Sequence, residues 1–234
     1  MQWISHYQLF LFDFDGLLVD TERLHFQAYI NMCLQRGFSL KWNFHRYSAA
    51  AHHKSTDLRD QIYAEFPELY AIEPDWSVLY EEKRLQFIHL IENGIVPLMP
   101  GAANLLLALQ EADIKRCVVT HSANSLIQRI RKQNPILDTI SHWITREDYT
   151  NPKPHPECYQ FAINKFSQPN DRVIGFEDSP RGLQALLETT AQPILICPPD
   201  SSYLEKLISN PRLNYYPTFD AIREDNAPHP DNRL

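Results

Sequence analysis

The stretch that decides the fold is Gln8-Leu9-Phe10-Leu11-Phe12-Asp13-Phe14-Asp15-Gly16, an apolar run of strand length that ends in two aspartates one residue apart. Successive side chains of a strand point to opposite faces, so Asp13 and Asp15 can share one face. Two carboxylates held close together repel each other, and a Mg²⁺ ion between them relieves that repulsion. The alternative is a simple turn, because Asp and Gly are common turn residues. The rest of the chain has to decide between these two interpretations.

The second half of the chain alternates between the periodicities of helices and strands. Such alternation is typical of right-handed βαβ units that build a parallel sheet. We therefore expect a Rossmann-like, doubly wound α/β core whose first strand spans residues 7–14. The expected helices are 102–110, 124–132, 154–166 and 181–189, and the expected strands are 116–120, 142–145, 172–176 and 194–197.

Residues 38–95 contain no convincing strand, and residues 19–96 are predicted to form an inserted all-helical unit. A helix is expected from residue 21 to 35, and a short one follows near residues 58–66, where Pro67 interrupts it. A longer helix is expected over 76–92, with Asn93-Gly94 as its stop. The predicted organisation is a core of residues 1–18 and 97–226, a helical cap of residues 19–96, and a frayed tail of residues 227–234.

Composition excludes several classes of protein. The formal charge is −7 with no long basic run, which argues against a nucleic-acid surface. No apolar run reaches the eighteen or so residues of a membrane span, and the N-terminus lacks the basic region of a signal peptide. The 4 cysteines are widely spaced, which favours buried thiols in a reducing cytosol. We expect a cytoplasmic protein with no membrane or nucleic-acid partner, and a monomer, with an oligomer left open.

Polar side chains follow the other expected strands at their carboxyl ends, where open parallel sheets bind ligands. They are Thr120-His121-Ser122, Lys153 and the pair Glu177-Asp178. Each has an ordinary explanation, as a helix cap, a solvated loop lysine or an acidic pair at a helix start. Together with Asp13 and Asp15 they predict a phosphoryl-transfer site. A carboxylate can attack phosphorus, and a second carboxylate can move the protons.

The same residues resemble the motifs of a known family. Phe12–Glu22 resembles the first motif of the haloacid dehalogenase superfamily, Val119–Ser122 the second, Lys153–Pro156 the third and Gly175–Gly182 the fourth. The resemblance is to the branch of phosphatases and β-phosphoglucomutases with a mobile helical cap.

This resemblance implies that Asp13 is the nucleophile and Asp15 the general acid/base. It implies Mg²⁺ bound by Asp13, by the backbone carbonyl of Asp15 and by Asp178, with Glu177 in support. Dehalogenases of the superfamily lack the second aspartate, so the presence of Asp15 favours phosphoryl transfer.

The expected function is a Mg²⁺-dependent phosphatase that hydrolyses a small phosphomonoester, with a sugar phosphate as one candidate. The alternatives are a β-phosphoglucomutase-like mutase and a non-catalytic phosphate-binding protein. For Lys54 and Lys83 a solvated helix face is an equal alternative, and His52-His53 are expected to be surface or cap-loop residues. The candidate catalytic residues are Asp13, Asp15, Thr120 and Lys153, and the candidate substrate-binding residues are Gly16, Thr21, His25, Lys54, Lys83, Thr120, His121, Ser122, Asn124 and Lys153.

Overall fold

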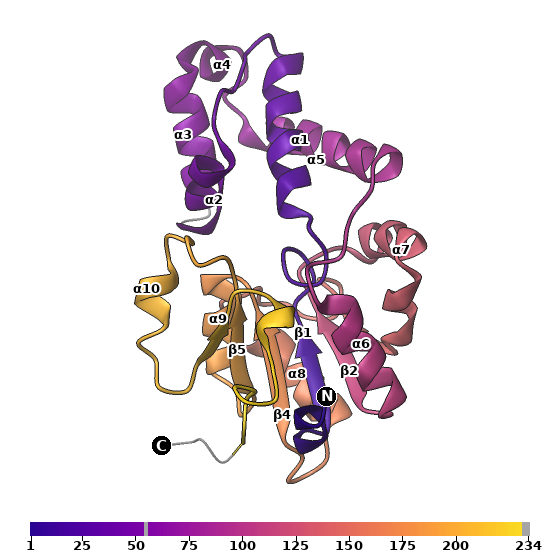
Figure 1. Ribbon diagram of the computed structural model, residues 1–234. Helices are drawn as coiled ribbons and strands as arrows, with labels where there is room; N and C mark the ends of the chain where they lie inside the picture. Colours follow the sequence, from indigo (N-terminus) through magenta and orange to yellow (C-terminus); the bar gives the residue numbers. More distant parts are fainter. Residues whose placement is uncertain (54–55, 231–234) are drawn as a thin grey trace. The chain divides into compact units, whose positions relative to one another are not determined.

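The chain folds into two compact units, each described here by itself. The computed structural model describes residues 1–53 and 56–230 (Figure 1). The core unit comprises Met1–Asp20 and Pro97–Leu234, and the helical unit comprises Thr21–Val96. The first boundary therefore lies two residues later than the one expected from the sequence.

The core unit is built on one parallel sheet of six strands in the order β3-β2-β1-β4-β5-β6. All neighbouring strands pair in parallel, as the alternating pattern of the sequence predicted. The doubly wound α/β fold is thus confirmed. The strands are β1 (Leu9–Phe12), β2 (Lys115–Val119), β3 (His142–Ile144), β4 (Val173–Glu177), β5 (Gln192–Ile196) and β6 (Asn214–Tyr216).

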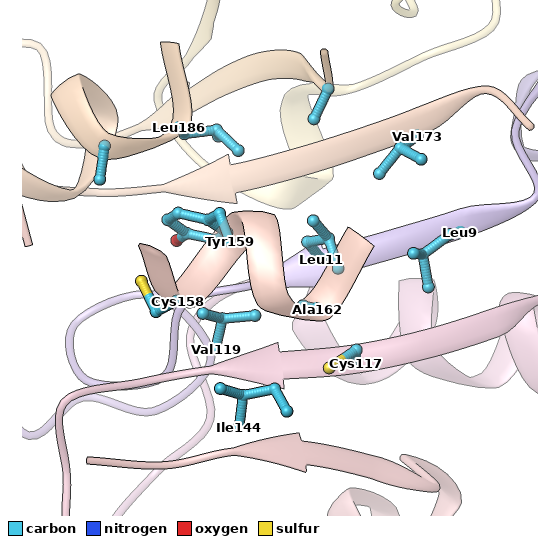
Figure 2. Packing of buried hydrophobic residues seen from close by; sticks show 12 residues of the cluster. Leu9, Leu11, Cys117, Val119, Ile144, Cys158, Tyr159, Ala162, Val173 and Leu186 are labelled. Carbon is cyan, nitrogen blue, oxygen red and sulfur yellow. The ribbon is translucent and has the colours of Figure 1, made fainter. Parts of the chain in front are cut away.

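Strand β1 is buried on both faces, which explains its unbroken apolar sequence. On one face Leu9 and Leu11 pack in a cluster with side chains of α8 (Glu157–Phe166) and α9 (Pro180–Leu187), as Figure 2 shows. On the other face the ring of Phe12 stacks on that of Phe176 with centroids 5.2 Å apart. Because the two faces are covered by different groups, a one-residue slip of β1 would exchange them.

Most of the remaining core helices lie between strands in sequence, whereas the first precedes β1 and the last follows β6. The sequence does not predict strand β6, because its three residues carry no clear alternation; Asn214 and Tyr215 are partly buried and Tyr216 is buried. It extends the sheet beyond β5, where the sequence had placed the last strand. The other helices of the core unit are η1 (Trp3–His6), α6 (Ala102–Glu111), α7 (Asn124–Gln133), η2 (Pro135–Thr139), α10 (Leu204–Leu207) and η3 (Phe219–Ala221).

The expectation of a frayed tail from residue 227 is wrong for its described part, residues 227–230. Pro228 and Pro230 are buried. The ring of His229 packs edge-on against that of His6, with centroids 4.6 Å apart. The tail is polar and proline-rich in sequence, but these contacts with η1 order it.

The helical unit packs its helices around an aromatic-rich core that includes Tyr29, Trp42 and Tyr47. Residues 48–53, which include the expected cap-loop residues His52 and His53, belong to a helix, because a run of alanines favours helix and Tyr47 and Ala50 are buried in the core. The expected short helix ends at Glu65, before Pro67, as the sequence predicted. Pro67 then begins the next helix, a position where its missing N–H costs nothing. The helices are α1 (Glu22–Gln35), α2 (Phe44–His53), α3 (Asp57–Glu65), α4 (Pro67–Ile72) and α5 (Trp76–Asn93).

Within residues 1–53 and 56–230, no helix combines the length and the apolar character needed to cross a bilayer. All 4 cysteines are free and buried, as their spacing predicted.

Candidate active site

The candidate site lies at the carboxyl edge of the sheet, where the strand order reverses direction. Asp13 follows β1 directly, and its N–H donates to Phe176 O of β4 at 3.0 Å. Glu177 ends β4 and Asp178 comes next. In open α/β sheets, ligands bind in the crevice at such a switch point. The sheet topology therefore brings together residues that lie about 165 positions apart in the chain, as the residue numbers of Asp13 and Asp178 give.

Lys153 is held directly against the Asp13 carboxylate. Its Nζ donates to Asp13 Oδ1 at 2.5 Å, to Glu177 Oε1 at 2.7 Å and to Val119 O at 2.9 Å. Burial disfavours the charged form of Lys153, but the charges of Asp13 and Glu177 outweigh burial and hold the pKa well above its usual value. Lys153 is thus a permanent cation beside Asp13. Among the described residues, no other side chain donates to the Asp13 carboxylate.

Glu177 is completely buried, and its carboxylate accepts a hydrogen bond from Lys153. Its Oε1 accepts from both Lys153 Nζ and the hydroxyl of Tyr159. Burial raises the pKa of Glu177, and the charge of Lys153 opposes that rise. A Cβ at Gly182 would lie 2.0 Å from Glu177 Oε2, so the glycine of the fourth motif leaves room for this carboxylate.

Asp15 accepts hydrogen bonds from two hydroxyl groups of the second motif. Ser122 Oγ donates to Asp15 Oδ2 at 2.6 Å, and Thr120 Oγ1 donates to the same oxygen at 3.3 Å. Thr120 in turn accepts from the backbone N–H of Ser122 at 3.0 Å. Asp15 is half-buried, whereas Asp13 is only 8% exposed. Neutral donors of this kind can give up their hydrogen bonds when a ligand or a proton arrives.

Three buried carboxylates could hold a metal ion. Asp13, Glu177 and Asp178 each offer an oxygen, and these atoms lie within 4.8 Å of one another. Carboxylate oxygens are the protein ligands that suit Mg²⁺, so the donor set fits this ion. Since Glu177 Oε1 already accepts two hydrogen bonds, Asp13 and Asp178 are the better direct ligands.

His121 extends the polar edge away from Asp15. Its Nδ1 lies 3.0 Å from the hydroxyl of Tyr149, and that hydroxyl donates to Thr120 O at 3.1 Å. With its hydrogen directed to Thr120 O, the phenol accepts a hydrogen bond from a protonated Nδ1 of His121. Burial lowers the pKa of His121, and nearby cations, first Arg146, lower it further. The imidazole is therefore neutral at neutral pH and keeps an accepting Nε2.

Other predicted substrate-binding residues of the core unit have partners of their own. The N–H of Gly16 donates to Val19 O at 2.9 Å within a turn, and its φ of 81° suits a glycine. Asn124 is exposed at the start of α7, and its Oδ1 accepts from Gln128 at 3.3 Å. The structure gives them local roles, and contact with substrate stays a prediction.

Three predicted residues, Thr21, His25 and Lys83, belong to the helical unit. Lys83 is buried, and its Nζ lies 2.6 Å from Nδ1 of His25. The alternative of a solvated Lys83 is therefore wrong, and its role toward substrate stays a prediction. Lys54 and the side chains of His52 and His53 lie outside the described residues.

Several residues around the site carry no signal in the sequence. Tyr159 falls in an amphipathic helix, where its ring fits the core, yet its hydroxyl meets Glu177 and Lys153 (Figure 2 labels it). Arg181 donates to the backbone carbonyl of Lys153 at 2.7 Å, and the hydroxyl of Tyr203 donates to Asp178 O at 2.7 Å. Only the tertiary structure identifies such contacts, because they link side chains to distant backbone and core atoms.

Comparison with known proteins agrees with this geometry. The chain is 25% identical over 181 residues to protein CbbY of Cereibacter sphaeroides, covering 75% of this chain and 77% of CbbY. It is 26% identical over 205 residues to hexitol phosphatase A of Escherichia coli K12, covering 88% of this chain and 86% of that enzyme.

The fold is similar to that of a β-phosphoglucomutase from Clostridium difficile, with a TM-score of 0.67, 20% identity and 94% of each chain covered. The sequence model of haloacid dehalogenase-like hydrolases matches residues 10–195, which include all four motifs. The chain belongs to the haloacid dehalogenase-like hydrolase family.

Proposed function

We propose that this protein hydrolyses a small phosphomonoester through an aspartyl-phosphate on Asp13. The observation that carries the proposal is the different environment of the two aspartates. Asp13 has a buried lysine on one carboxylate oxygen, at 2.5 Å, and Asp15 has hydroxyl donors. One carboxylate is positioned to attack, and the other is positioned to take up and release a proton.

In the first step Asp13 attacks phosphorus and the ester oxygen leaves. Asp15, once protonated, gives its proton to that leaving oxygen. In the second step Asp15 takes a proton from a water molecule, which attacks the aspartyl-phosphate and releases inorganic phosphate. Lys153 compensates the negative charge that gathers around Asp13 during both steps. Thr120 and Ser122 offer hydroxyl groups to the phosphate oxygens once Asp15 releases them.

Asp13 and Asp178 would hold Mg²⁺, together with the backbone carbonyl of Asp15, and Glu177 would support the site through Lys153. When bound, the ion supplies positive charge that reduces the repulsion between the phosphate and the carboxylates. Removal of divalent metal with a chelator should abolish phosphate release, and added Mg²⁺ should restore it.

The relatives suggest the size of the substrate. Hexitol phosphatase A is named for a phosphorylated polyol, and one solved CbbY structure contains xylulose-(1,5)bisphosphate. We propose a substrate of similar size, a phosphorylated sugar, polyol or related small metabolite.

The deciding experiment measures phosphate release from a panel of phosphomonoesters, with and without Mg²⁺, by the wild type and by Asp13→Asn. Wild-type turnover that the variant lacks is the expected result. Full activity in Asp13→Asn would overturn the mechanism, and no turnover on any ester would favour a non-catalytic binding protein. Incubation with β-glucose 1-phosphate and a bisphosphate activator tests the mutase alternative, because a mutase would form glucose 6-phosphate without releasing phosphate.

A further inference from the structure

An exposed arginine stands at the same edge of the sheet. Arg146 comes two residues after β3, is exposed, and lies beyond the motifs of the sequence. In the described part of the chain, no carboxylate forms an ion pair with Arg146 and no acceptor bonds to its guanidinium. An arginine is a strong donor for planar or tetrahedral anions, since it can give two parallel hydrogen bonds.

The backbone fixes Arg146 beside the second motif. The N–H of Thr120 donates to Ile144 O at 2.9 Å, and the N–H of Arg146 donates to Ser122 O at 3.4 Å. These two bonds continue the pairing of β2 and β3 past the ends of both strands. Arg146 is thereby held level with Ser122, whose hydroxyl bonds to Asp15.

The carboxylates of the two residues that follow Arg146 accept hydrogen bonds from nearby groups. Glu147 Oε2 accepts from the hydroxyl of Thr145 at 2.6 Å, and Glu147 Oε1 accepts from Asn124 N at 3.4 Å. Asp148 Oδ2 accepts from Thr145 N at 2.8 Å. Arg146 helps to lower the pKa of Glu147, but within residues 1–53 and 56–230 neither carboxylate forms an ion pair with the guanidinium, which remains available to a ligand.

Other cations lie close enough to add to the field at this edge. Arg181 donates to the carbonyl of Lys153 through one nitrogen only, and it is exposed. His121 feels the charges of Arg146, Arg181 and Lys153. Lys153 is occupied by Asp13 and Glu177, so the charge free to meet a second anion is that of the two arginines.

The separation suits one small molecule. Asp13 follows β1 and Arg146 follows β3, with β2 between them. Two strand spacings correspond to about 10 Å across the sheet. Part of that distance is covered by the arginine side chain, which leaves room for a short carbon skeleton between the reacting phosphate and a second anionic group.

We propose that Arg146 binds a second anionic group of the substrate, so that the preferred substrate is a phosphomonoester that also carries a phosphate or a carboxylate. This inference rests on the proposed phosphatase function and deepens it by naming the substrate class. A free hydroxyl in place of the second anion leaves the guanidinium without its partner.

The test compares matched substrates that differ only in the second group. Fructose 1,6-bisphosphate is paired with fructose 6-phosphate, and 3-phosphoglycerate is paired with glycerol 3-phosphate. We expect kcat/KM of the wild type to be higher for the member with the second anion by about tenfold to a hundredfold, mostly through KM. A preference in the first pair alone assigns a phosphate, and a preference in the second pair alone assigns a carboxylate.

Substitutions of Arg146 test whether this residue causes the substrate preference. In Arg146→Gln the ratio of kcat/KM within the preferred pair should fall toward one, and Arg146→Lys should keep part of it. The matched control is Arg172→Gln, an exposed arginine just before β4 at the opposite edge of the sheet, which should keep the wild-type ratio. Equal kcat/KM within both pairs, or an unchanged ratio in Arg146→Gln, would overturn the inference while ester hydrolysis stands. Absence of phosphate release from every ester would instead overturn the proposed function, and this inference with it.

Discussion

The surroundings of Asp13 and Asp15 differ in every physical respect although the residues are two positions apart. Asp13 is buried against Lys153, whose charge cannot be lost near neutral pH. Asp15 is half-buried and bonds to the hydroxyl groups of Ser122 and Thr120. A buried cation holds a carboxylate in place and offsets its charge, whereas neutral hydroxyl donors suit a carboxylate that exchanges a proton. The difference teaches how one short stretch can supply both a nucleophile and an acid/base.

The strongest test of this comparison is Asp15→Asn, which removes proton transfer and keeps the shape of the side chain. We expect kcat to fall by about 10²- to 10⁴-fold on an alkyl phosphate. The loss should be smaller on p-nitrophenyl phosphate, because p-nitrophenolate leaves without a proton. Steady-state kinetics on both esters measure the two losses. Equal losses on the two esters would contradict the assignment of Asp15 to leaving-group protonation.

Replacing the cation is expected to affect both activity and stability. In Lys153→Met the carboxylates of Asp13 and Glu177 lose their buried partner. We expect kcat to fall by about 10²- to 10³-fold, and the free energy of unfolding to fall by about 3 kcal/mol. Phosphate release and urea unfolding measure the two effects. Lys132→Met, an exposed residue of α7, serves as the control and should match the wild type in both.

The hydroxyl of Tyr159 supports the Asp13 side of the comparison indirectly. Tyr159→Phe keeps the ring in the core and removes a hydrogen bond to Glu177. We expect a loss of about 1 kcal/mol in stability and a decrease of about tenfold or less in kcat, with KM little changed. Tyr215→Phe, which removes a hydroxyl bonded to Cys197 O at 3.2 Å, is the control for loss of a phenol hydroxyl. An unchanged kcat in Tyr159→Phe would show that Lys153 needs no help from this group.

The smallest loss of activity is expected when one hydrogen-bond donor to Asp15 is removed. Ser122→Ala removes one hydroxyl donor, and Thr120 remains as the other. Because a neutral hydrogen bond contributes about 1 kcal/mol, kcat/KM should fall about fivefold. Kinetics on the substrate preferred in the panel measure this change. A loss as large as that of Asp15→Asn would mean that Ser122 does more than hold Asp15.

The sequence by itself determined the sheet and the order of its motifs. Apolar strands that end in Asp13, Thr120 and Glu177 alternate with amphipathic helices, and local periodicity is enough to specify such a pattern. Strand β6 and helix α2 could not be predicted in this way, because a short edge strand and an alanine-rich segment show little hydrophobic periodicity.

Only the tertiary structure decided the partners within the site. It joined Lys153 to Asp13 and Glu177 and added the hydroxyl of Tyr159. It also placed Arg146 beside Ser122, with no carboxylate of the described residues in an ion pair with it. These contacts depend on which strand ends meet and on which acidic side chains are used elsewhere. The spacing of residues in the sequence shows neither of these features, because the side chains of the site meet across the sheet, whereas spacing is measured along the chain.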